Sequence, residues 1–221
     1  MVPESRAGVL KDQVDRAIGE LIASLPAPDR LSRADRRGII ARYTAVLEGN
    51  FIYWMTAAHL AVASDTAHAI IEDNLREEVR DNHPGMLRRF AIAAGALPTD
   101  TDVLAVHREL GAVRRFVAGL SPTRIVLMMA FFEGFITRFM PYLADLAGRQ
   151  GSSELQYTDV HGVVDIEHTE GLFRALDAEL ALSAAPPSTA AMIEGVGTLR
   201  ALLERIVEVQ VPVSLTNGVA A

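Results

Sequence analysis

The sequence predicts an all-α protein, folded as a single up-and-down bundle of about seven helices. Apolar residues recur at spacings of three and four along most of the chain, and no stretch of any length alternates as a β-strand does. Aromatic residues make up only 6% of the chain, whereas Ala and Leu are abundant, which favours helix over sheet. Short segments rich in Pro, Gly or Ser separate the periodic stretches, as the short loops of such a bundle do.

Residues that stop or start helices bound these periodic stretches. Pro26 ends the first helix, and Ser32 is a favoured N-cap for the second. Pro84 is expected to end the third, and Ser121 followed by Pro122 begins the most apolar helix of the chain. The predicted helices span residues 9–25, 33–64, 65–84, 102–120, 122–147, 155–182 and 189–209, with a short helical segment at 86–94 and a tail at 211–221.

Length and composition narrow the classes of protein to consider. A chain of 221 residues is ample for one buried core, so we expect a single domain over residues 1–221. The net charge of −7 argues against nucleic acid as the main partner, because phosphate binding needs a basic surface. Cysteine is absent, which excludes disulfides, Cys-ligated metals and Cys nucleophiles. Because neither a signal-peptide pattern nor a run of about 18 apolar residues occurs, we expect a cytoplasmic protein without a membrane span.

The strongest chemical signal is a triplet late in the chain. His161, Asp165 and His168 are separated by four residues and then by three. Residues at these spacings lie on one face of a helix, with Cβ atoms about 5–6 Å apart. Two imidazoles and a carboxylate on one face suit a borderline metal such as iron, manganese or zinc. The alternative is a chance cluster of surface residues, in which case Val163 and Ile166 take the buried face.

Acidic residues on the other helices are candidates for further ligands. Glu133 is the best of them, because it interrupts an otherwise apolar segment at residues 128–136. A carboxylate there must be paired, protonated or metal-bound, unless it occupies the exposed position of its helix. Glu77 or Glu78 is the second candidate, although acidic runs on helices usually form solvated faces, and Glu48 is a weaker one.

The remaining histidines carry less signal. His83 precedes Pro84 at a predicted helix end and is either a ligand or a solvent-facing residue. His59, His68 and His107 have no acid or histidine partner at ligand spacing. His59 also lies in an apolar run, which is typical of a hydrogen-bonded core histidine.

Taken in chain order, these residues resemble the motifs of the haem-oxygenase-like di-iron oxidases and oxygenases. That superfamily also contains the TenA-type thiaminases, the pyrroloquinoline-quinone synthase and haem oxygenase itself. The triplet matches the family pattern His-x3-Asp-x2-His, Glu133 corresponds to a single Glu about thirty residues upstream, and residues 74–78 match an earlier Asn-Leu-x-Glu-Glu motif. The resemblance spans roughly residues 30–180. It implies one or two Fe(II) ions bound by Glu77, Glu133, His161, Asp165 and His168, with O2 as co-substrate.

One position departs from the family pattern. Ten residues after the liganding Glu77 the family has a metal-binding histidine, where this chain has Leu87. Leucine cannot bind a metal. Three interpretations follow: His83 takes its place, one metal site is incomplete, or the chain holds a single ion.

The resemblance favours one function and leaves two alternatives. Thiaminase-type members use a Cys nucleophile, which this chain lacks, and haem oxygenase has its proximal histidine in the first helix, whereas the first here is His59. The implied function is therefore a non-haem iron oxidase or oxygenase acting on a small organic acid or amino-acid-like metabolite in a biosynthetic pathway. The alternatives are a metal-free or single-metal relative of the quinone synthase or the thiaminases, and a non-enzymatic helical binding protein with a degenerate site. Long apolar helices and an acidic surface also lead us to expect a homodimer.

Overall fold

A computed structural model describes residues 6–185 and 187–209, and the expected all-α bundle is confirmed in them. These residues form eight α-helices, slightly more than the predicted seven, and one 3-10 turn, and they contain no strand. The elements are α1 (Arg6–Ala23), η1 (Pro28–Arg30), α2 (Arg33–Ala61), α3 (Asp65–Arg80), α4 (His83–Ala93), α5 (Asp100–Val117), α6 (Pro122–Arg149), α7 (Gln156–Leu182) and α8 (Thr189–Val207). The predicted tail at residues 211–221 lies outside the described residues.

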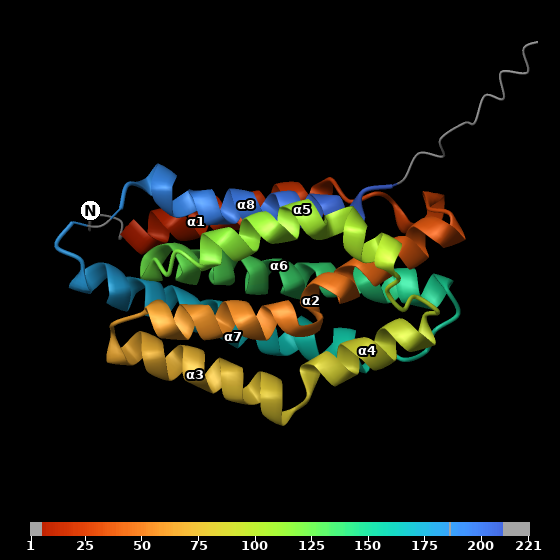
Figure 1. Ribbon diagram of the computed structural model, residues 1–221, viewed down its shortest axis with the longest axis horizontal. Coiled ribbons are helices and arrows are strands. Elements are labelled where there is room, and N and C mark those ends of the chain that lie inside the picture. Colours follow the sequence, from red (N-terminus) through yellow and green to blue (C-terminus); the bar gives the residue numbers. More distant parts are fainter. Residues whose placement is uncertain (1–5, 186, 210–221) are drawn as a thin grey trace, which may run out of the picture.

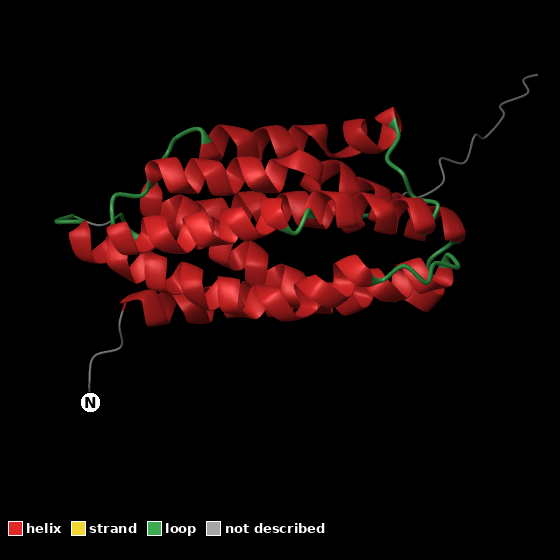
Figure 2. Cartoon of the chain, turned by 90° about the horizontal axis from the view of Figure 1, so that it is seen from below, coloured by secondary structure: helices red, strands yellow, loops and turns green. Residues whose placement is uncertain are grey.

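The helices lie side by side along the long axis of the molecule, with α6 in the middle (Figure 1). The same common direction is visible from below, where short loops join the helices (Figure 2). Helix α6 packs most extensively on α7 and also contacts α1, α2 and α8. On its other side α7 contacts α3 and α4, which also pack on α2. Side chains on the inner faces of α3, α4, α6 and α7 therefore approach one part of the core.

Helix α6 forms the centre of that core. Seventeen of its residues are buried, and they include four phenylalanines and three methionines. By length and composition α6 is also the one helix of the described residues that could cross a membrane, but 72% of its apolar window is buried inside the bundle. Helices packed on several sides are apolar all round for this reason.

Helix α2 is interrupted in its middle. Glu48 and Gly49 leave the helical conformation, and Gly49 has a φ of 101°, which only glycine adopts without strain. The apolar periodicity runs on across the interruption, which is why the sequence predicted a helix that continues past Gly49 and did not predict the break. Leu47 and Phe51, on either side of the break, line the cavity described below.

The predicted end of the third helix at Pro84 is wrong. Helix α3 ends at Arg80, and Asn82 takes a left-handed conformation with a φ of 55°. The Asn82 side chain accepts a hydrogen bond from the backbone N–H of Gly85 and caps the start of α4. Pro84 then lies in the first turn of α4, where a missing N–H costs nothing. This arrangement makes His83 the first residue of α4 and buries it.

Candidate metal centre

The polar triplet of α7 points into the core. His161, Asp165 and His168 are 4%, 1% and 5% exposed, whereas Val163 and Ile166 between them are 68% and 51% exposed. A surface cluster would show the opposite arrangement, so that alternative is wrong. Helix α7 instead buries its ligand-type residues and leaves apolar ones outside, which is costly unless the buried groups have a partner.

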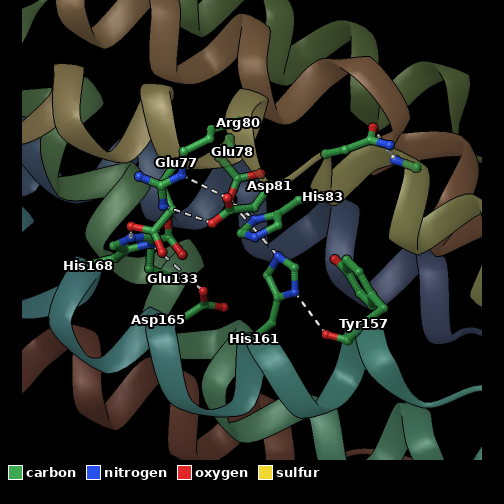
Figure 3. Close-up of polar contacts among 12 residues, drawn as sticks. Glu77, Glu78, Arg80, Asp81, His83, Glu133, Tyr157, His161, Asp165 and His168 are labelled. Atoms are coloured by element: carbon green, nitrogen blue, oxygen red, sulfur yellow. Dashed lines mark hydrogen bonds and ion pairs between the residues drawn. The ribbon is translucent and has the colours of Figure 1, made fainter.

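Six buried side chains form two adjacent groups in this part of the core (Figure 3). In each group the candidate ligand atoms lie within 4.8 Å of one another. The first group is Glu78, His83 and His161, and the second is Glu133, Asp165 and His168. Glu133 also lines the cavity that all members of the first group line, so the two groups adjoin.

The first group joins α3, α4 and α7. Nδ1 of His83 lies 2.7 Å from Oε1 of Glu78, and Nε2 of His161 lies 4.0 Å from the same oxygen. Nδ1 of His161 donates a hydrogen bond of 2.8 Å to the backbone carbonyl of Tyr157. In a neutral imidazole this fixes the proton on Nδ1 and leaves the lone pair of Nε2 directed at the group. Metal-binding histidines are commonly held in this way.

The second group contains buried polar atoms that have no hydrogen-bond partner among the described residues. They are Oε1 of Glu133, both carboxylate oxygens of Asp165 and Nδ1 of His168. Nδ1 of His168 lies 3.9 Å from an oxygen of Glu133 and 3.9 Å from an oxygen of Asp165. Buried polar atoms in proteins are almost always paired, because an unpaired one loses its hydration without compensation. One cation placed among these four atoms would satisfy all of them, so the residues fit a bound metal.

The electrostatics of the centre agree with this interpretation. Burial, together with the neighbouring carboxylates, raises the pKa of Glu133 and that of Asp165 well above their usual values. Burial also lowers the pKa of His161 to about 4, so its imidazole is neutral and able to bind a metal. Burial opposes protonation of His83 as well, but its contact with Glu78 outweighs this and raises its pKa. A divalent cation would reverse the mutual repulsion of the carboxylates.

The structure also places the other candidates. Glu77 is outside both groups, with Oε2 3.3 Å from Nε2 of His168, on the side of the ring away from Glu133 and Asp165. Its neighbour Glu78 occupies the first group. Glu48 lies at the break in α2, where it forms an ion pair with Arg88 on α4.

The sequence does indicate that Glu78 points inward. The indication is the spacing of the inward-facing residues along α3, and the acidic run itself does not give it. The buried residues of α3 are Ala67, Ile71, Asn74 and Glu78, at spacings of four, three and four. This is the inward stripe of an amphipathic helix. Extending the stripe from its apolar members favours Glu78 over Glu77 as the core residue.

A cavity adjoins the first group. Its polar end is formed by Glu78, His83, His161 and Glu133, and its walls are largely apolar. The apolar lining residues are Leu47, Phe51, Ile52, Pro84, Leu87 and Ile136. The cavity is narrow and partly open to solvent. Leu87, at the position of the expected histidine, is therefore a wall residue of this cavity.

Comparison with known proteins gives one family. A family model of the haem-oxygenase type, described as iron-containing redox enzyme, matches residues 40–203. The matched range covers most of the chain and contains all six residues of the two groups together with Glu77. The comparison with curated proteins gave no match.

Proposed function

The chain belongs to the haem-oxygenase-like family of iron-containing redox enzymes, and we propose from this premise that it is a non-haem iron oxidase or oxygenase that uses O2. The observation that carries the proposal is the second group, in which four buried ligand atoms of Glu133, Asp165 and His168 have no hydrogen-bond partner within residues 6–185 and 187–209. Imidazole nitrogen and carboxylate oxygen, without sulfur, are the donor set of non-haem iron enzymes.

We assign one ion to each group. Glu78, His83 and His161 hold the first, and Glu133, Asp165 and His168 hold the second. Glu133 lies between the two groups, because it belongs to one and lines the cavity of the other. Fe(II) held by these residues would supply electrons for the reduction of O2. In this assignment Glu77 acts through His168, because its contact with Nε2 leaves Nδ1 of that ring facing Glu133 and Asp165.

The apolar cavity is the substrate site of this proposal. Phe51, Leu87 and Ile136 would pack against the hydrocarbon part of a small metabolite and exclude water from it. The polar end of the cavity, at His83 and His161, would face the group to be oxidised. The walls fit a small organic acid with an apolar body better than an amino acid with a charged side chain, and the carboxylate of that acid would face the metal ions held at the polar end.

The two alternatives have less support. None of the residues lining the cavity is Lys or Arg, which a large polyanionic quinone precursor would need. The degenerate-site interpretation depended on Leu87, but His83 places an imidazole 2.7 Å from Glu78 in the same cavity. The first group therefore has three ligand-type side chains despite the leucine.

Anaerobic titration with Fe(II), followed by exposure to O2, tests the proposal. We expect the wild-type chain to bind two equivalents and to consume O2 as the iron is oxidised. The double variant His161→Ala/His168→Ala removes one imidazole from each group and is expected to bind neither ion tightly.

The control is His59→Ala/His68→Ala. It removes two histidines whose rings lie 4.8 Å apart outside the centre, and we expect it to bind as the wild type does. A wild-type chain that binds no Fe(II), or binding that persists unchanged in His161→Ala/His168→Ala, would overturn the proposal.

A further inference from the structure

A second hollow lies between α3 and α7 and reaches His168 from the side away from the apolar cavity. It is a groove with a free space of about 840 Å³, counting the part open to solvent. We propose that this groove is the route by which hydrated divalent cations reach the metal centre, with Asp73 and Glu167 as transient ligands. The inference rests on the proposed function, because it assumes that the centre takes up a metal.

The charge of the groove suits a cation. Three carboxylates line it, those of Asp73, Glu77 and Glu167, against the single guanidinium of Arg174. Asp73 is largely exposed, and its ion pair with Arg76 spans 3.9 Å, whereas Arg76 lies 2.6 Å from Glu72. Carboxylates in a hollow focus the local field and raise the local concentration of counter-ions.

The carboxylates also form a series from solvent to the core. Asp73 and Glu167 are exposed, Glu77 is half-buried, and His168 behind it is buried. Oε2 of Glu77 lies 3.3 Å from Nε2 of His168. The unpartnered atoms of Glu133 and Asp165 lie on the other side of that ring. A cation that passes Glu77 therefore arrives at the second group.

A buried amide at the inner wall supports this route independently of the charges. Asn74 is 7% exposed and lines the groove, yet its amide nitrogen has no hydrogen-bond partner in the part of the chain that the structure describes. Such a group needs a ligand or a water molecule to satisfy it. A water carried in the hydration shell of a passing ion would accept the hydrogen bond that Asn74 can donate.

The apolar cavity is a poor route for the same ion. A divalent cation keeps its hydration shell until oxygen or nitrogen ligands replace it, and aliphatic walls offer none. The bundle thus has two openings of different chemistry, one for the metal and one for the organic substrate.

The rate of metal uptake tests this inference separately from the proposed function. We would mix the metal-free chain of residues 1–221 with Co(II) by stopped flow at low ionic strength and follow the visible absorption of bound Co(II). The double variant Asp73→Asn/Glu167→Gln is expected to take up Co(II) about 10-fold more slowly, since steering by local charge changes association rates by about 10-fold or more. The number of ions bound at equilibrium is expected to stay the same.

The matched control is Asp12→Asn/Glu109→Gln, which changes the net charge equally on α1 and α5 and should leave the rate unchanged. A second variant, Val163→Lys, adds a cation to the lining without removing an acid and should also slow uptake. Its control is Leu104→Lys, at a similarly exposed position on α5.

The outcomes separate the two ideas. If Asp73→Asn/Glu167→Gln takes up Co(II) at the same rate as its control, the groove is not the route of metal entry. The proposal of a metal centre would stand in that case. A reduced stoichiometry in that variant would also overturn the groove as the route, because the two acids would then be permanent ligands. Absence of uptake in the wild type would overturn the proposed function and the groove together.

Discussion

Nδ1 of His83 lies 2.7 Å from Oε1 of Glu78, although the two side chains come from different helices. The left-handed turn at Asn82 ends α3 and starts α4, and it turns His83 inward. Leu87, one helical turn further on, lines the same cavity as both residues. In the proposed assignment His83 takes, one turn earlier, the role of the histidine that the family resemblance places at position 87.

If His83 replaces a histidine at position 87, an imidazole at either position should complete the first group. His83→Leu is expected to lose one of two Fe(II) equivalents in anaerobic titration, because the first group then keeps only Glu78 and His161. The double change His83→Leu/Leu87→His is expected to recover that equivalent. His107→Leu, an exposed histidine on α5, is the control. Retention of both ions by His83→Leu alone would contradict the assignment of the first group.

Glu133→Gln is expected to stabilise the metal-free protein and weaken metal binding at the same time. Burial and nearby carboxylates make the ionised form of Glu133 costly without a cation, and a neutral amide of the same shape removes about 1–2 kcal/mol of that cost. Thermal unfolding without and with Fe(II) measures both effects. The variant should unfold at a higher temperature than the wild type without metal and gain less on adding it. A lower unfolding temperature in both conditions would contradict this prediction.

Local patterns were enough to predict much of this centre. The spacing of His161, Asp165 and His168 requires only that residues 161–168 be helical. Glu133 was identified because an isolated carboxylate in an apolar helix needs a partner, and it is 1% exposed. Both inferences depend on helical periodicity, which also gave the all-α fold. Neither requires knowledge of how distant helices meet.

The first group could not be predicted in the same way. Whether His83 points inward depends on the break at Asn82, and the sequence alone suggested that Pro84 ended the preceding helix. Moving that boundary by a few residues rotates the side chain from solvent to core. The inward stripe of α3 favours Glu78 over Glu77 as its core residue, but it does not predict which side chains of α4 and α7 Glu78 meets there.

A pair of buried tyrosines next to the centre gives a prediction about stability alone. The hydroxyl groups of Tyr43 and Tyr157 lie 2.9 Å apart, and both rings are buried. Tyr157→Phe leaves the Tyr43 hydroxyl without this partner and is expected to cost about 1–3 kcal/mol of unfolding free energy. In Tyr43→Phe/Tyr157→Phe neither hydroxyl of the pair remains. The loss of unfolding free energy in the double variant should therefore be smaller than the sum of the losses in the two single variants.

Urea unfolding of the two single variants and the double variant measures this coupling. Metal stoichiometry should be unchanged in Tyr157→Phe, because His161 is held by the backbone carbonyl of residue 157 and not by its side chain. Strictly additive free energies would show that the two hydroxyls do not interact. Loss of a metal ion would show that the phenol itself takes part in the centre.

The ion pair of Asp102, which lies outside the metal centre, is expected to make the free energy of unfolding depend on pH. Asp102 accepts hydrogen bonds from Arg37 at 2.9 Å and from the backbone N–H of Thr99 at 2.8 Å, and it links α5 to α2. Burial opposes its ionisation, but the hydrogen bonds from Thr99 and Arg37 outweigh burial and lower its pKa. Because the folded pKa lies below the unfolded one, this stabilisation is present above about pH 4 and is lost as the pH falls through the folded pKa.

The test compares the wild type with Asp102→Asn by urea unfolding at a series of pH values. The difference in unfolding free energy should be constant from about pH 5 upward and should shrink below about pH 4, where Asp102 becomes protonated in the unfolded and then in the folded chain. Asp100→Asn, at an exposed position in the same first turn, is the control for the general effect of a carboxylate near a helix start. A difference that stays constant to pH values well below 4 would mean that Asp102 acts through its shape and hydrogen bonds and not through its charge.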